Sequence, residues 1–264
     1  MTPIWGRRLA WLGAVAGLLL ALLLFAPARW LADAVTRATA GQVQLVNPRG
    51  TVWQGRADLL FTGGDGSRTQ TALPQGLAWR LRPTLVSSMP AMALSLSAPC
   101  CTSVPLGATV VPRWGGAQVA LAAFTSRWPA ELLSGLGTPW NTLRIQGQLA
   151  LQSDGLSLRV DRGRLGLQGV LVVDALDIAS RLSTLRPLGS YRLELRAQAD
   201  ANTANLSLST LRGDLLLQGS GQWVGGRLRF RGEAEAAAGR EVALTNLLNI
   251  MGKRQGARSV FSVG

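Results

Sequence analysis

The pattern of hydrophobic and polar positions divides the chain into one long apolar run and a remainder that largely alternates. The run extends from Leu9 to Ala26, lies behind Arg7 and Arg8, and contains no charged residue. At ~1.5 Å per residue it would form a helix of ~27 Å, close to the ~30 Å hydrocarbon core of a bilayer. The pattern predicts a transmembrane anchor over residues 9–28, with membrane-facing side chains at Leu9, Leu18, Leu22, Phe25 and Trp30.

A cleavable signal peptide is the alternative, because Ala26-Pro27-Ala28 places small residues where a signal peptidase acts. The apolar stretch of a cleaved signal usually has ~7 to 15 residues, whereas this run is longer and leads into Trp30, an aromatic suited to the headgroup level. We therefore expect an uncleaved, single-pass anchor. The closely spaced arginines before the run favour residues 1–8 in the cytoplasm and residues 29–264 outside it.

Alternation in the rest of the chain predicts strands far more often than helices. Residues 91–98 place Met92, Leu94 and Leu96 on one face and serines on the other. Turn signals fall about every 8 to 12 residues, which is typical of an antiparallel meander. The clearest strands are expected at 42–46, 91–98, 143–151, 156–160, 164–173, 191–197, 204–209, 213–219 and 227–231.

Helical spacing is confined to a few short segments, so the fold class is mainly β with one to three short helices after the anchor. Trp30 to Ala38 is an amphipathic stretch, and Pro129 can open a helix that Gly137 ends. Near the C-terminal end, Leu244 to Met251 carries leucines at helical spacing, with Gly252 as the stop. Together these features predict an elongated, twisted antiparallel sheet over residues 29–264.

Composition adds a strong positive charge to this picture. The net charge is +13, and Lys253 is the only lysine, so the basic character is almost wholly that of arginine. Arginine binds phosphates well, in nucleic acids or in lipid headgroups. A compositional preference of the source genome together with solvated strand faces also explains this charge. If the arginines bind a counterpart outside the cytoplasm, we expect anionic membrane lipid or an acidic protein, and no nucleic acid.

Two adjacent cysteines, Cys100 and Cys101, are the only ones in the chain. Neighbouring cysteines cannot make an ordinary loop-closing disulfide. A strained vicinal bridge, pairing with another chain and two free thiols remain as alternatives.

Residues for catalysis are scarce. The chain has no histidine, which removes the commonest general base and the commonest metal ligand. It contains no phosphate-binding loop or nucleophile elbow, and Gly63 to Gly66 indicates a turn. Asp174 and Asp177 are spaced for acid and base work, but spaced surface carboxylates are usually solvated. We expect a protein that is not an enzyme and has no metal or cofactor.

Glycine and tryptophan residues recur along the chain at a recognisable spacing. Gly50 and Gly55 bracket a short strand that contains Trp53, and such glycines permit bulges or close backbone approach. The segment Gly-Thr-Val-Trp-Gln-Gly-Arg-Ala over 50–57 is followed by Trp-Arg-Leu at 79–81, Pro-Leu-Gly-Ser-Tyr at 187–191, Leu-Leu-Leu-Gln-Gly at 215–219, Gln-Trp at 222–223 and Phe-Arg-Gly at 230–232.

In this order and spacing, the sequence resembles general secretion pathway protein N, a component of the bacterial type II secretion machinery. The resemblance covers essentially the whole length. It implies an inner-membrane accessory protein whose β-rich periplasmic domain docks other inner-membrane subunits, and it brings no catalytic residues. The signature positions are expected to be structural: Gly50, Trp53, Gly55, Trp79, Pro187, Gly189, Tyr191, Gly219 and Gly232.

The sequence is also similar in style to the anchored AsmA-type β proteins, whose curved sheets offer an apolar groove to lipids. Such a protein needs one sheet face that is apolar and open. The strands at 165–173 and 215–217 are apolar enough to line a groove, and they fit an ordinary core equally well. Lipid handling is therefore the alternative function.

Overall fold

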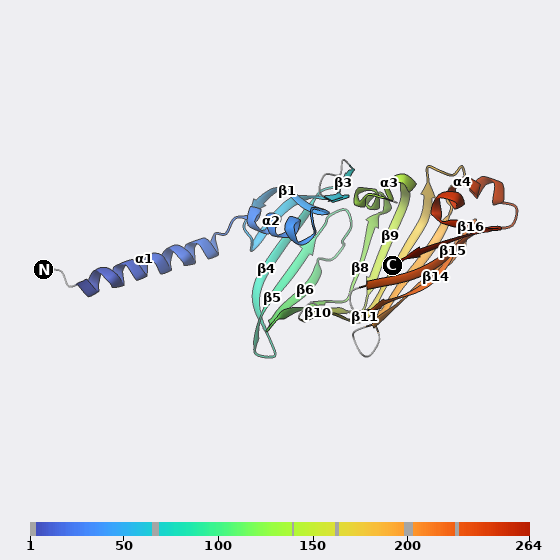
Figure 1. The fold of residues 1–264 in the computed structure, drawn as a ribbon. Helices are drawn as coiled ribbons and strands as arrows, with labels where there is room; N and C mark the ends of the chain where they lie inside the picture. The colour runs from blue at the N-terminus through green and yellow to red at the C-terminus, as the bar shows by residue number, and fades with distance from the viewer. Residues whose placement is uncertain (1–3, 65–68, 139, 162–163, 198–202, 225–226) are drawn as a thin grey trace.

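The protein is a curved antiparallel sheet from which one helix projects (Figure 1). The structure, a computed structural model, describes residues 4–264 except 65–68, 139, 162–163, 198–202 and 225–226. Within these ranges 17 strands join into one continuous sheet, which confirms the prediction of a mainly antiparallel β fold.

The first part of the sheet is built from the N-terminal strands. Its hydrogen-bonded order is β1, β2, β4, β5, β6, β7, β10, and β3 pairs with β2 alongside the start of β4. The bounds are β1 Val43–Gly50, β2 Gln54–Thr62, β3 Gln70–Ala72, β4 Leu77–Val86, β5 Met89–Ser97, β6 Leu106–Arg113, β7 Gly116–Leu121 and β10 Leu156–Asp161.

The second part contains the C-terminal strands. Its order is β8, β9, β11, β12, β13, β14, β15, β17, β16. The bounds are β8 Phe124–Pro129, β9 Ile145–Ser153, β11 Arg164–Ser180, β12 Gly189–Ala197, β13 Thr203–Gly213, β14 Leu215–Val224, β15 Arg227–Ala236, β16 Lys253–Gln255 and β17 Arg258–Val263.

The two parts meet on β11, which is longer than the strand predicted at 164–173. Its first residues pair with β10, from Arg164 to Gly169, and its later residues pair with β9 and β12. One long strand therefore belongs to both parts and makes the sheet continuous. A bulge follows Leu176 on the β9 side, where Asp177 has a positive φ of 50°.

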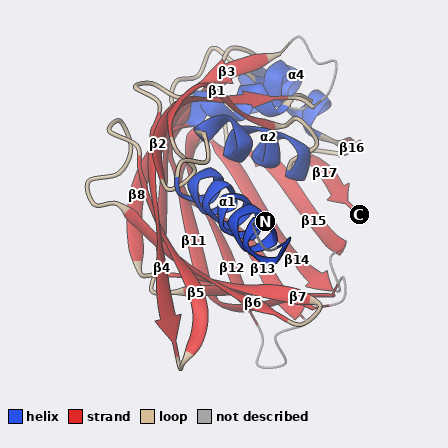
Figure 2. Cartoon of the chain, turned by 90° about the vertical axis from the view of Figure 1, so that its left-hand side faces the viewer, coloured by secondary structure: helices blue, strands red, loops and turns tan. Residues whose placement is uncertain are grey.

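Short helices cover one end of the strands, and the core lies beneath them (Figures 1 and 2). They are α2 Ala28–Ala38, the 3-10 helix η1 Ala130–Leu136, α3 Trp140–Leu143 and α4 Glu241–Met251. One buried cluster joins α2 and η1 to β1, β2 and β4 around Trp79 and Leu59. A second joins α4 to β11, β12, β14 and β15 around Leu244 and Tyr191.

Three of these helices were predicted, and their limits follow from local chemistry. The amphipathic stretch ending at Ala38 is helical, and α4 ends at Gly252 as expected. Pro129 precedes η1 and Gly137 ends it with φ +84°, although the segment is a 3-10 helix. The four-residue α3 was missed because four residues carry no readable period, so four short helical segments follow α1 instead of one to three.

The apolar run forms α1, Ile4–Leu24, which ends four residues before the predicted limit of the anchor. In the part of the chain that the structure describes, no helix has the length and hydropathy needed to cross a membrane. The predicted transmembrane anchor over 9–28 is therefore not found as such. Its last residues belong to the sheet domain instead, since Ala26 and Ala28 are buried and α2 begins at Ala28.

Candidate interaction surfaces

The junction between α1 and the sheet is built by four residues that the sequence singled out. The indole Nε1 of Trp53 donates a hydrogen bond of 2.8 Å to the carbonyl oxygen of Leu23, in the last turn of α1. Gly50, with φ +95°, lies opposite Gly55 across the hairpin of β1 and β2, so Trp53 lies in the turn of this hairpin and the short strand predicted between the two glycines is wrong. The ring of Trp79 packs on Gly55, where a Cβ atom would lie 2.9 Å from Cε2 of the indole, and its Nε1 donates to the carbonyl of Val52. These signature residues therefore fix the base of α1.

The backbone completes this junction. The amide of Val52 donates to the carbonyl of Ala26 at 2.8 Å, and Pro27 forms a β-bridge with Thr51. The chain between α1 and α2 is thus bound to the tip of the first hairpin. Helix α1 cannot swing freely about residues 25–27 while these bonds persist.

Residues 10–24 of α1 are exposed, and so is Phe25 directly after the helix. The predicted anchor residues Leu18, Leu22 and Phe25 are 61%, 47% and 75% exposed, and Trp30 on α2 is 47% exposed. Leu9 lies within α1 as well. A helix that is apolar all round normally lies in lipid or inside a protein. Exposure of the apolar side chains of α1 to water is therefore energetically unfavourable.

Tyr191 is the signature residue that lies in the second buried cluster, and Pro187 and Gly189 are close to it along the chain. Pro187 follows a cis peptide bond, and a Cβ atom on Gly189 would lie 2.8 Å from the hydroxyl of Tyr191. That hydroxyl donates to the carbonyl of Leu215. Burial raises the pKa of Tyr191, and the negative charge of Asp214 raises this pKa further.

Gly219 and Gly232 lie directly opposite each other on β14 and β15. A Cβ atom on Gly219 would lie 2.9 Å from the carbonyl of Arg231, and one on Gly232 would lie 3.1 Å from the ring of Phe230. Both glycines therefore make room for close packing.

The inner face of the sheet, which packs on the helices at one end, stays apolar beyond them. Leu85, Val160 and Val263 on this face are more than a third exposed, and most of its other apolar side chains are partly exposed. The indole Nε1 of Trp223 is buried and has no hydrogen-bond partner among the described residues. Apolar cross-strand pairs on this face include Leu94 with Ala108, Val110 with Val119, Val119 with Leu158, Val173 with Leu193, and Leu193 with Leu208.

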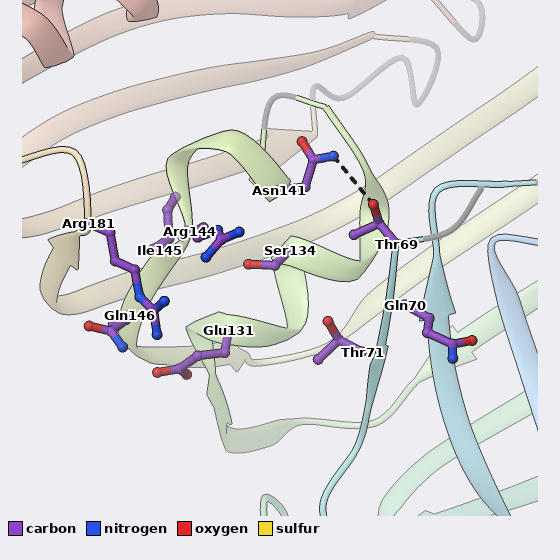
Figure 3. A pocket seen from close by; sticks show the side chains of 10 residues that line it. All are labelled: Thr69, Gln70, Thr71, Glu131, Ser134, Asn141, Arg144, Ile145, Gln146 and Arg181. Atoms are coloured by element: carbon purple, nitrogen blue, oxygen red, sulfur yellow. Dashed lines mark hydrogen bonds between the residues drawn. The ribbon is translucent and has the colours of Figure 1, made fainter.

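A polar pocket of about 430 Å³ opens where the two parts of the sheet meet (Figure 3). Its walls come from β3, η1, α3 and β9, and Arg181 enters from the end of β11. Arg144, at the end of α3, has φ +43°. Within the described residues, the side chains of Glu131, Arg144 and Arg181 form no ion pair. No sequence motif indicated this pocket, because its residues come from separate elements.

The two cysteines form a vicinal disulfide, which selects one of the three alternatives. They lie in the turn after β5, and the carbonyl of Cys101 accepts a hydrogen bond from the amide of Arg127 on β8. Cys101 is buried in the first cluster, and Cys100 is exposed.

The two aspartates considered for acid and base work point to different arginines. Asp174 accepts a bidentate pair of hydrogen bonds from Arg192 at 2.7 Å, which raises the pKa of that arginine. Asp177 pairs with Arg212. Among the described residues, no group of three or more cysteines and carboxylates is placed to hold a metal ion. The turn predicted at 63–66 lies partly outside the described residues.

Comparison with known proteins gives one match. No curated protein and no solved structure matches the chain. The family model for type II secretion system protein N matches residues 41–261, which takes in nearly all of the sheet, the second buried cluster and all nine signature positions, whereas α2 lies before the matched residues. This protein therefore belongs to the type II secretion system protein N family.

Proposed function

We propose that the protein acts by binding, as an accessory component held at the bacterial inner membrane by α1, with its sheet domain docking other secretion subunits in the periplasm. Membership of the family supports a role in type II secretion. The junction between α1 and the first hairpin is the observation that carries the rest. It couples an exposed apolar helix to a folded domain through Trp53 and Val52.

Contact between α1 and water costs free energy, which favours attachment of the helix to a membrane. Sixteen consecutive residues, from 10 to 25, are exposed, and each methylene group that they bury in lipid would contribute roughly 0.8 kcal/mol. Helix α1 is therefore expected to lie in lipid. Confinement to the membrane would raise the local concentration of other membrane-embedded subunits.

The polar pocket is the best candidate for docking. Glu131, Arg144 and Arg181 offer both signs of charge around it, and none of them forms an ion pair with another described residue. A partner segment that supplies complementary charges would gain charge-assisted hydrogen bonds there. Such contacts give an interface its specificity.

Crosslinking inside the cell tests this proposal. A photoactivatable residue at Thr71 or Gln146 in the pocket should capture a secretion subunit, identified by mass spectrometry, while the same residue at Ser207 on the outer face of β13 should not. Recovery of lipid alone from the pocket positions would contradict docking. Removal of residues 4–24 should release the protein from membranes washed with carbonate, and N-terminal sequencing would show whether α1 remains attached.

A second candidate function, lipid handling along the inner face, is favoured by one observation. The Nε1 of Trp223, which has no partner among the described residues and lies on a largely apolar face, suits a ligand with acyl chains and a carbonyl oxygen. Lipid extraction from the purified protein tests it. Substitution of Val119 by Asp on the inner face should abolish retained lipid, whereas substitution of its outer-face neighbour Ala120 by Asp should not.

A further inference from the structure

We propose that four arginines on the outer face of the first strands, Arg49, Arg56, Arg80 and Arg82, bind the phosphate groups of anionic phospholipids beside α1. We call them the arginine patch. This inference rests on the proposed attachment of α1 to a membrane. It adds a second contact, which would hold the sheet domain in a fixed orientation on the bilayer.

Strand register gathers these side chains. Arg49 on β1 is the direct partner of Arg56 on β2, and Arg80 on β4 is the direct partner of Gln54 on β2. Diagonal neighbours in an antiparallel pair lie ~7–8 Å apart, which places Arg80 within reach of Arg56. Arg82 follows on the same face of β4. All four are exposed, while Gly55, Ala57 and Trp79 face the other way.

Among the residues that the structure describes, the arginine patch has no anionic partner. All six ion pairs between described residues join groups from Asp174 to Arg258, in the second part of the sheet. The nearest carboxylate on the face, Asp58, accepts a hydrogen bond of 2.9 Å from Asn47. Like charges directly opposite each other are destabilising, so Arg49 and Arg56 favour an external anion.

The position of the patch identifies the anion. The amide of Leu81, between Arg80 and Arg82, donates to the carbonyl of Trp53, whose indole binds the end of α1. In Figure 1, α1 leaves the molecule at the end where β1 and β4 lie. If α1 is in lipid, these guanidinium groups lie close to the headgroups.

Aromatic side chains at the same junction fit this placement. Phe25 and Trp30 are 75% and 47% exposed beside the base of α1, where an interfacial aromatic belt would be expected. Guanidinium groups bind phosphate oxygens in a bidentate manner. Anionic phospholipid is therefore the ligand that both the chemistry and the location favour.

The test uses the full chain reconstituted into two kinds of vesicle, one of phosphatidylcholine and one that also contains phosphatidylglycerol. Each carries a trace of phosphatidylglycerol with a photoactivatable headgroup, and mass spectrometry locates the labelled peptides. We expect labelling of the peptides that contain Arg49, Arg56, Arg80 and Arg82, and competition by unlabelled phosphatidylglycerol. The combined variant Arg49→Gln, Arg56→Gln, Arg80→Gln, Arg82→Gln should lower this labelling at least about tenfold, since each arginine near an anionic surface contributes ~1 kcal/mol.

A matched variant controls for net charge. Replacement of Arg159, Arg227, Arg229 and Arg231 by Gln removes the same charge from outer-face positions far from α1 along the sheet, and none of these forms an ion pair with a described residue. It should leave the labelling unchanged. Equal loss in both variants, or equal labelling throughout the sheet, would overturn the inference.

Flotation of the same vesicles separates the two proposals. A chain that does not float with either vesicle contradicts membrane attachment by α1. A chain that floats but is not labelled at the arginine patch leaves attachment intact and overturns only the headgroup site. Crosslinking of the patch in cells to an acidic protein instead of lipid would also overturn it.

Discussion

The indole nitrogen of Trp53 donates its hydrogen bond to the carbonyl oxygen of Leu23 across 30 residues of sequence. The carbonyls of the last turn of a helix have no partner within that helix, so this bond supplies one. It also sets the direction in which α1 leaves the sheet. Trp53 thus links α1 to the sheet domain, two elements that the sequence pattern presents as separate.

Replacement of Trp53 by Phe should loosen α1 without unfolding the sheet. Phenylalanine keeps an aromatic ring but has no side-chain N–H group, so the hydrogen bond to Leu23 is lost. We expect this loss to weaken the junction by about 0.5–1.5 kcal/mol. Spin labels on cysteines introduced at Gly17 and Ser95 report the distance between α1 and β5, and a side chain at Gly17 meets nothing within 4 Å. The distance distribution should broaden. The control Trp114→Phe, at a side chain that is 97% exposed, should leave it unchanged.

Replacement of Gly55 by Ala should destabilise the sheet domain. The new Cβ atom would lie 2.6 Å from the carbonyl oxygen of Arg49 and would press on the buried ring of Trp79. Overpacking of this kind costs about 1–3 kcal/mol, measurable as a lower urea midpoint. Gly107 is the matched control, because its Cβ atom would make an ordinary contact of 3.5 Å with Ala122. Equal midpoints for the two variants would contradict the packing at the junction.

Stability should fall at alkaline pH because of Tyr191. Its pKa in the folded protein is raised, whereas in the unfolded chain it is close to 10. The contribution of Tyr191 to the free energy of unfolding is therefore complete below about pH 10. Above that pH the tyrosine of the unfolded chain ionises first, and the free energy of unfolding falls by up to ~1.4 kcal/mol per pH unit until the folded protein ionises too.

Tyr191 is the only tyrosine, so the ultraviolet absorbance of phenolate reports its ionisation directly. The absorbance change should coincide with unfolding. Tyr191→Phe should remove this part of the pH dependence and should also lose the hydrogen bond to Leu215. Titration of phenolate near pH 10 in the folded protein would refute the prediction.

The vicinal disulfide should contribute little to global stability. It closes a loop between adjacent residues, so its effect on the entropy of the unfolded chain is small, on the order of 1 kcal/mol. Urea unfolding with and without a phosphine reductant measures the difference. After reduction, alkylation should modify Cys100 before Cys101, since only Cys101 is buried. A large loss of stability on reduction would contradict this prediction, because it would mean that the disulfide stabilises the packing around the turn as well as the turn itself.

Local patterns were sufficient for a good part of the fold. The helical stretch ending at Ala38, the stop of α4 at Gly252 and the strands from 143 onward depend on spacing and on glycine or proline, which act within a few residues. Strands β6 and β7 were missed because their glycines and alanines give little contrast between apolar and polar positions, and the short β8 was missed as well. The family resemblance was confirmed by the match over residues 41–261.

The sequence by itself determined that an apolar helix precedes an antiparallel sheet, that Cys100 and Cys101 have no ordinary loop to close, and that arginine dominates the charge. Only the tertiary structure decided that β11 joins two parts of one sheet, that Trp53 binds the end of α1, and that four arginines share one face beside it. The physical reason is that strand register and contacts between distant segments depend on which strands pair. No local pattern of residues specifies that pairing.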